Sequence, residues 1–85
     1  MYTGNCLCGG ITFQINAELK PIQVCHCRQC RQAQGVPFAA NIPVDTSGFE
    51  LLSGEGLLKE YESSEGKQRV FCSNCGSPIF SKKAS

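Results

Sequence analysis

The sequence has no excess of charge of either sign, no long apolar run and no internal repeat. Eight Lys and Arg residues against seven Asp and Glu residues give a formal net charge of +1, so no strong field would attract nucleic acid or an anionic membrane. No apolar stretch approaches the roughly 18 residues of a membrane-spanning helix, and the N-terminus lacks the basic and apolar regions of a secretory signal. We therefore expect a cytoplasmic protein that binds neither nucleic acid nor membranes.

The chain is also too short for a large apolar core. It has 85 residues, and a chain of this size buries a limited share of its surface. Seven residues are cysteines, an odd number that disulfide bonds alone cannot use up. In the cytoplasm thiols stay reduced, and clustered cysteines more often bind metal or take part in catalysis. We expect a single zinc-binding domain over residues 1–85.

Nine glycines and four prolines divide the chain into short segments. Alternating apolar and polar residues predict half-buried strands, and the five phenylalanines in these segments are expected to lie in the core. Good helix formers that end at Gly35 predict one short helix over residues 28–34. Residues 49–52 and 57–61 flank a Ser-Gly-Glu-Gly turn and are predicted to pair as a hairpin. The strand-like segments are residues 11–15, 21–25, 38–42, 49–52, 57–61, 68–71 and 78–80. The predicted fold class is all-β, mainly antiparallel, with one short helical turn after Cys27.

The cysteines fall into three groups along the chain: Cys6 and Cys8; Cys25, Cys27 and Cys30; Cys72 and Cys75. Structural zinc takes four ligands, usually contributed as two close pairs. The first and last pairs are each followed by glycine, which can adopt the conformation that turns backbone N–H groups toward a thiolate. The spacing therefore predicts one closed four-cysteine zinc site that ties the two ends of the chain together.

The middle group offers three ligands and an open position, which is the pattern of catalytic zinc. Zn²⁺ with three thiolates carries a net negative charge, so it activates water poorly but can hold a further thiolate. Cys25, Cys27 and Cys30 thus favour chemistry on a sulfur-containing substrate. Alternatively, His26 or an outside group completes the ligand set and the site is structural, although in an extended segment His26 points away from the neighbouring sulfurs.

Three motifs follow one another in an order and spacing that are specific. They are Gly4-Asn5-Cys6-Leu7-Cys8-Gly9-Gly10-Ile11, Cys25-His26-Cys27-Arg28-Gln29-Cys30-Arg31 and Phe71-Cys72-Ser73-Asn74-Cys75-Gly76-Ser77. Together they resemble the glutathione-dependent formaldehyde-activating enzyme (GFA) family, which is related to centromere protein V. The resemblance covers nearly the whole chain. It implies a β-tent-like fold, in which small antiparallel sheets are joined by zinc.

The resemblance also implies two zinc ions per chain and a carbon–sulfur lyase activity like that of S-hydroxymethylglutathione synthase. The implied substrate is glutathione or a similar small thiol together with an aldehyde adduct, such as that of formaldehyde. The structural zinc corresponds to Cys6, Cys8, Cys72 and Cys75. The second zinc corresponds to Cys25, Cys27 and Cys30, with its fourth position open to the thiolate. Resemblance and charge suggest a set of substrate-binding residues: Arg28, Arg31, Ser63, Ser64 and Arg69. For Arg28 and Arg31 the alternative is a solvated helix face.

A second function stands beside the lyase, namely a non-catalytic zinc module that mediates protein interaction. Domains of the family usually continue well past the final Cys-x-x-Cys-Gly motif, whereas this chain ends ten residues after Cys75. The chain is then a short member, a C-terminally truncated fragment, or a domain that another chain completes. An incomplete sheet leaves an exposed edge, through which a homo-oligomer could form.

Overall fold

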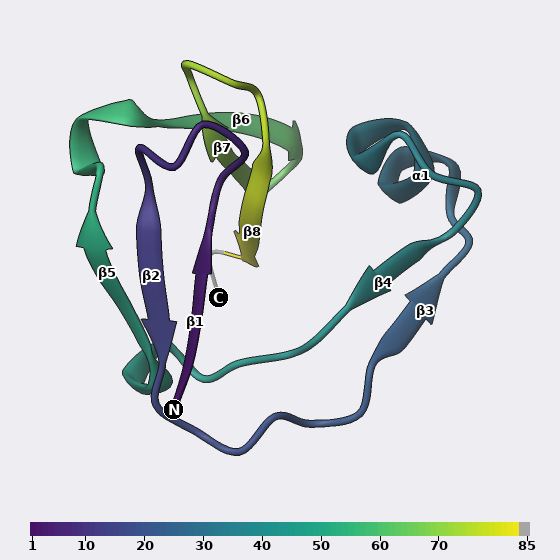
Figure 1. The fold of residues 1–85 in the computed structure, drawn as a ribbon. Helices are drawn as coiled ribbons and strands as arrows, with labels where there is room; N and C mark the ends of the chain where they lie inside the picture. Colours follow the sequence, from purple (N-terminus) through teal and green to yellow (C-terminus); the bar gives the residue numbers. More distant parts are fainter. Residues whose placement is uncertain (84–85) are drawn as a thin grey trace.

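The computed structural model describes residues 1–83, which form three small antiparallel sheets and one α-helix (Figure 1). The predicted fold class is thereby confirmed, and the helix spans the predicted residues. The elements are β1 (Tyr2–Asn5), β2 (Thr12–Ile15), β3 (Gln23–Cys25), α1 (Arg28–Gln34), β4 (Ala39–Asn41), β5 (Phe49–Ser53), β6 (Leu58–Ser64), β7 (Lys67–Cys72) and β8 (Pro78–Lys83), with short 3₁₀ turns at Thr46–Gly48 and Glu55–Leu57.

The first sheet has the strand order β1-β2-β5, the second consists of β3 and β4, and the third has the order β6-β7-β8. Strand β1 was not predicted, because Tyr2–Asn5 carries no apolar alternation of its own. It forms by pairing with β2, in a register that sets Tyr2 opposite Ile15. At Gly4 an added Cβ would lie 2.7 Å from a ring carbon of Phe13. Glycine here lets the ring lie against the backbone of β1.

The predicted hairpin of residues 49–52 and 57–61 is wrong. Strand β5 pairs with β2 in the first sheet, whereas β6 pairs with β7 in the third. Gly54 has a φ of +87°, and the 3₁₀ turn Glu55–Leu57 follows it directly. An added Cβ at Gly54 would lie 2.7 Å from Ile11 Cα. The turn therefore passes over the backbone after β1 and carries the chain into another sheet instead of reversing it.

The fully buried core is small and contains sulfur. Its central cluster consists of Cys6, Ile11 and Cys72, surrounded by half-buried residues that include Leu51, Leu57 and Ile79. Cys30, Ala39 and Val70 are also buried. Three phenylalanines pack against one another: Phe13 stacks on Phe49 with ring centroids 5.4 Å apart, and Phe80 lies tilted against Phe49 at 5.1 Å.

The prediction that all five phenylalanines lie in the core is wrong for Phe38, and the other four are half-buried at the edge of the core and not fully buried. The Phe38 side chain is 46% exposed and packs beside the His26 ring, with centroids 5.8 Å apart. Phe38 directly precedes β4, whose first residue Ala39 is fully buried. Because successive side chains of an extended segment point to opposite faces, Phe38 lies on the outer face.

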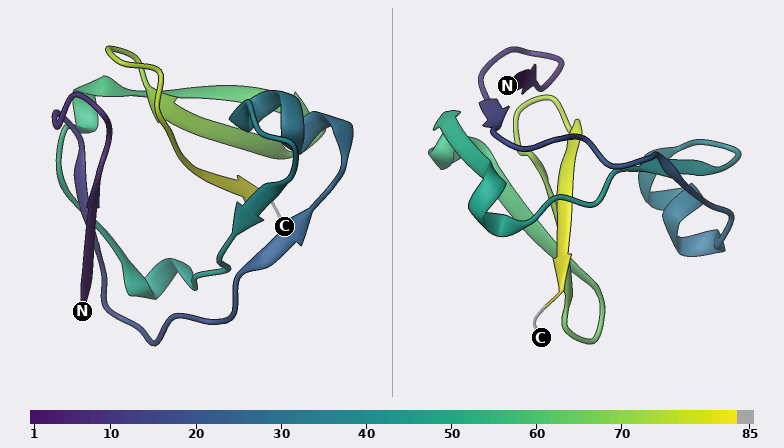
Figure 2. Two further views of the ribbon diagram at one scale, coloured as in Figure 1. Left: turned by 45° about the vertical axis from the view of Figure 1, so that its right-hand side comes forward. Right: turned by 90° about the horizontal axis from the view of Figure 1, so that it is seen from below.

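Strands β3 and β4 and helix α1 form an arm that stands apart from the first sheet (Figures 1 and 2). The tip of the arm, helix α1, comes back to the ends of β6 and β7. There Gln29 Nε2 donates a hydrogen bond of 3.1 Å to the backbone carbonyl of Ser63. Within residues 1–83, no helix is long and apolar enough to cross a membrane.

Candidate metal centres

The first cysteine cluster joins the two ends of the described chain. Cys6 and Cys8 lie in the turn between β1 and β2, Cys72 is the last residue of β7, and Cys75 lies in the turn between β7 and β8. Their four sulfurs lie within 4.8 Å of one another. Cys8 Sγ is 3.5 Å from Cys6 Sγ and 3.8 Å from Cys72 Sγ. Tetrahedral zinc–thiolate geometry requires sulfurs about 3.8 Å apart, so the four side chains fit one closed metal site.

Both turns that carry this cluster direct a backbone N–H group at a cysteine sulfur. Ile11 N donates to Cys6 Sγ at 3.3 Å, and Cys75 N donates to Cys72 Sγ at 3.4 Å. The residues Gly9 and Gly76 both have a φ of +77°. This left-handed conformation is open to glycine, and it is part of the turn that points N–H groups at sulfur. Such bonds stabilise a thiolate, which is the form that binds metal.

The second cluster lies at the junction of β3 and α1. Cys25 ends the strand, Cys27 is the N-cap of the helix, and Cys30 lies in its first turn. The three sulfurs are within 4.8 Å of one another, and no fourth His, Cys, Asp or Glu ligand joins them within residues 1–83. Cys30 N donates to Cys27 Sγ at 3.3 Å, which both caps the helix and stabilises a thiolate. The donor set fits a soft metal with one open position.

The thiol pKa values differ between the two clusters in the metal-free protein. Hydrogen bonds with the hydroxyl and the backbone N–H of Ser77 lower the pKa of Cys75 to about 5. The Cys27 thiol and then the Arg69 guanidinium lower the pKa of Cys30 to about 7. For Cys25 the Cys27 backbone N–H lowers the pKa, but the neighbouring thiols of Cys30 and Cys27 outweigh it, and the pKa is raised. The four-cysteine cluster therefore holds the more acidic thiol.

Arg69 connects the second cluster to the third sheet. From β7, its Nη2 donates to Cys30 Sγ at 3.4 Å and to Gln29 Oε1 at 3.1 Å, and its Nε donates to Ser63 Oγ at 3.1 Å. The guanidinium thus places a positive charge against a site that three thiolates would make negative. Gln29 belongs to this network but was not predicted, because nothing in a glutamine between two cysteines marks it as functional.

The other predicted substrate-binding residues lie in different places. Ser63 is part of the Arg69 network, whereas Ser64 is exposed and lies beyond it on β6. Arg28 and Arg31 line a hollow on another side of α1, together with Gln32 and Gly35. Both arginines are exposed. The structure therefore brings Ser63 and Arg69 to the second cluster and sets the two helix arginines on a different face.

These features define a small antiparallel β protein with two separate cysteine clusters, one with four sulfurs and one with three. Residues 1–85 match the family of the glutathione-dependent formaldehyde-activating enzyme. The chain belongs to this family, as its motifs suggested.

The chain is also similar to one curated relative and one solved structure. The chain is 33% identical over 79 residues to an uncharacterized lyase of Schizosaccharomyces pombe, and the match covers 93% of the chain and 56% of the relative. The chain thus spans about half the length of this curated relative. A crystal structure of a Rhodobacter sphaeroides protein has a TM-score of 0.79 and 23% identity, over 96% of this chain and 74% of that one. At this identity the likeness shows the fold alone.

Proposed function

We propose that the protein is a zinc-dependent carbon–sulfur lyase that acts on the adduct of a small thiol and an aldehyde. The observation that carries the proposal is the second cluster, in which three cysteine sulfurs converge without a fourth protein ligand among the described residues. Family membership and the lyase name of the yeast relative support it. Zinc is the metal proposed for both clusters, because sets of cysteine thiolates without carboxylates are typical of it.

The proposed reaction forms or breaks one carbon–sulfur bond. In the forward direction the thiolate electron pair attacks the aldehyde carbon, the carbonyl π pair moves to oxygen, and that oxygen takes up the proton lost by the thiol. The reverse reaction returns thiol and aldehyde. Zinc, when bound, would favour the thiolate form of the substrate by supplying a positive charge beside the sulfur.

The chain's own residues would fix the site around that thiolate. Cys27 and Cys30 are held by the helix N-terminus, and Gln29 and Arg69 hold the helix against the third sheet. These contacts keep the open side of the cluster in a constant position relative to β7. Preorganisation of this kind lowers the cost of bringing thiol and aldehyde together.

The proposal is tested with protein in which cobalt replaces zinc, because sulfur–cobalt charge-transfer bands report directly on thiolate binding. We expect two metal ions per chain and a spectral change on addition of a small thiol, and the zinc protein should accelerate thiol–aldehyde adduct cleavage. A protein that binds one metal ion, leaves Cys25, Cys27 and Cys30 free for alkylation and shows no spectral response to any small thiol would exclude the proposal.

Arg69→Gln is expected to weaken metal binding at the second cluster by about tenfold, because outer contacts of metal ligands typically change affinity by one to two orders of magnitude. Arg69→Lys should retain part of the metal affinity, since lysine keeps the positive charge but lacks the planar guanidinium group with its several N–H donors. The measurement is the rate at which a chelator removes the more labile metal ion. Arg28→Gln, on the other side of α1, is the matched control and should leave this rate unchanged. Equal effects of both glutamine variants would contradict the role given to Arg69.

Acid is expected to remove zinc from the second cluster at a higher pH than from the first. A lowered thiol pKa favours the thiolate, and this advantage is lost only as the pH falls through the lowered value. In the metal-free protein that value is about 5 for Cys75 and about 7 for Cys30. A colorimetric zinc indicator should show two release steps during acid titration, and Cys27→Ser should lack the step at higher pH. A single step that releases both ions together would contradict the prediction.

A further inference from the structure

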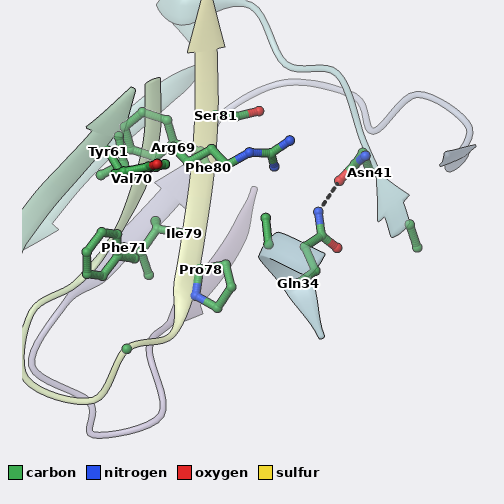
Figure 3. Close-up of a pocket in the computed structure, with 13 residues that line it drawn as sticks. Gln34, Asn41, Tyr61, Arg69, Val70, Phe71, Pro78, Ile79, Phe80 and Ser81 are labelled. Atoms are coloured by element: carbon green, nitrogen blue, oxygen red, sulfur yellow. Dashed lines mark hydrogen bonds between the residues drawn. The ribbon is translucent and has the colours of Figure 1, made fainter. Parts of the chain in front are cut away.

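A cavity of about 460 Å³ lies between the arm and the third sheet (Figure 3). One wall comes from β7 and β8 and includes Phe71, Ile79 and Phe80. The opposite wall comes from α1 and β4, where Gln34 Nε2 donates to Asn41 Oδ1 at 2.9 Å. Its volume lies within the range of about 300–1,000 Å³ that is typical of sites for small organic ligands.

The walls are mainly apolar and carry one charge. Aromatic and aliphatic side chains of β7 and β8 form most of the surface, and Arg69 is the only charged residue among the described residues that line the cavity. No carboxylate is present among these described lining residues. In Figure 3 the guanidinium of Arg69 reaches from β7 across the cavity toward Gln34 and Asn41. Its Nε and Nη2 are engaged by protein acceptors, whereas no acceptor among residues 1–83 takes the hydrogens of Nη1.

The cavity and the second cysteine cluster share one side of α1. Cys30, Ala33 and Gln34 are three and four residues apart and therefore lie on the same face of the helix. Ala33 and Gln34 line the cavity, one turn beyond Cys30. Arg69 contacts Cys30 Sγ and also lines the cavity, so it marks the boundary between the two. A ligand in the cavity would have its charged end beside the sulfur site.

We propose that this cavity binds the organic body of the substrate, and that the substrate is an aryl or alkyl thiol with a single carboxylate. The apolar wall of β7 and β8 would bury the hydrocarbon part, and the free Nη1 of Arg69 would pair with the carboxylate. Only one part of this inference rests on the proposed function, namely that the ligand is a thiol. The cavity's preference for an apolar body with one anionic group follows from its lining.

This lining matches glutathione less well. Glutathione carries two carboxylates and one ammonium group, whereas the cavity offers one guanidinium and no carboxylate within the described residues. The ammonium would have no charged partner, and a charged group removed from water without a partner is costly. The uncharged amides of Gln34 and Asn41 already bond to each other. Selectivity should therefore favour an apolar monocarboxylate over a zwitterionic peptide.

Two probes test separately whether the cavity binds the organic body and whether the second cluster binds the sulfur. Hydrocinnamate carries a phenyl ring and one carboxylate but no sulfur, and its binding is followed by the NMR signal of the Ile79 δ1 methyl group. The corresponding thiol, α-sulfanylhydrocinnamate, is compared with glutathione through the spectrum of the cobalt-substituted protein. We expect hydrocinnamate to shift the Ile79 signal, and its uncharged amide to bind about tenfold more weakly, as expected for loss of a charge-assisted hydrogen bond to Arg69.

A matched pair of variants locates the binding. Ala33 is exposed on the cavity side of α1, and Gln32 is exposed on the other side. Ala33→Phe should fill the cavity and weaken hydrocinnamate binding at least about tenfold, the effect of excluding one aromatic ring from an apolar site. Gln32→Phe should leave it unchanged. Because both positions are exposed, both variants are expected to fold, and zinc content verifies this.

The outcomes separate this inference from the proposed lyase. No response of Ile79 to hydrocinnamate, or equal weakening by both phenylalanine variants, overturns the cavity assignment. Tighter binding of glutathione than of α-sulfanylhydrocinnamate overturns the substrate class but leaves the lyase proposal intact. Binding of hydrocinnamate that depends on Ala33, without a cobalt response to any thiol, supports the cavity assignment and counts against the lyase.

Discussion

Cys72→Ser is expected to abolish the folded state of the protein. Cys72 is fully buried and belongs, with Cys6 and Ile11, to the central cluster of a small buried core. The chain therefore has little apolar burial with which to offset the loss of chain entropy. Structural zinc in small domains supplies an apparent binding free energy of about 10–16 kcal/mol, which is comparable to or larger than the whole stability of a typical domain. Loss of one ligand at this site should remove most of that contribution.

The expected result is a collapse of signal dispersion in the ¹H–¹⁵N NMR spectrum and loss of the cooperative thermal transition. Excess chelator should do the same to the unmodified protein. Cys27→Ser is the matched control, because it removes a sulfur from the second cluster and leaves the four-cysteine site complete. It should retain the dispersed spectrum and one zinc ion. A Cys72→Ser protein that keeps native dispersion without zinc would show that the sheets hold together without the metal.

Cys27→Ser is expected to reduce thiol-dependent activity by more than about a hundredfold. Contacts that only orient metal ligands are worth up to about that factor, and Cys27 is itself one of only three sulfurs in the second cluster. Its Sγ also accepts the hydrogen bond from Cys30 N that caps α1. Substitution therefore removes a ligand and loosens the position of Cys30 at the same time. The rate of adduct cleavage, together with zinc content, measures the effect.

His26→Ala serves as the control for this variant. His26 is adjacent to Cys27, but its ring packs beside Phe38 and it is not part of the three-sulfur group. Activity and zinc content should be unchanged when His26 is replaced. If His26→Ala lost the second zinc ion as Cys27→Ser does, the histidine would be a fourth ligand and the site would be structural and not open.

The cysteine clusters are the part of the protein that could be predicted from the sequence. Ligands of one metal come in close pairs, and the glycines after Cys8 and Cys75 mark turns that present N–H groups to sulfur. Those signals are local, so they can be read along the chain. The structure confirms that the first and last pairs meet and that the middle three stay together. The helix of residues 28–34 could be predicted for the same reason, because the glycine at its C-terminal end, Gly35, is also a local signal.

Strand partners could not be predicted in the same way. Alternation marked β5 and β6 as strands, and a glycine-rich turn between them suggested that they pair. Gly54 instead turns the chain across Ile11, so that β5 pairs with β2 and β6 pairs with β7. The exposure of Phe38 could not be predicted either, because alternation does not say which of two neighbouring residues faces inward, and in the structure it is Ala39.

The sequence by itself determined the division of the seven cysteines into groups of four and three, and most of the short strands and the helix that carry them, because spacing and periodicity are properties of neighbouring residues. Only the tertiary structure decided which sheet each strand joins, that Arg69 reaches Gln29 and Cys30 from another sheet, and that a cavity lies beside them. These features depend on residues about 40 positions apart, whose meeting is set by packing over the whole chain and leaves no mark in the local pattern.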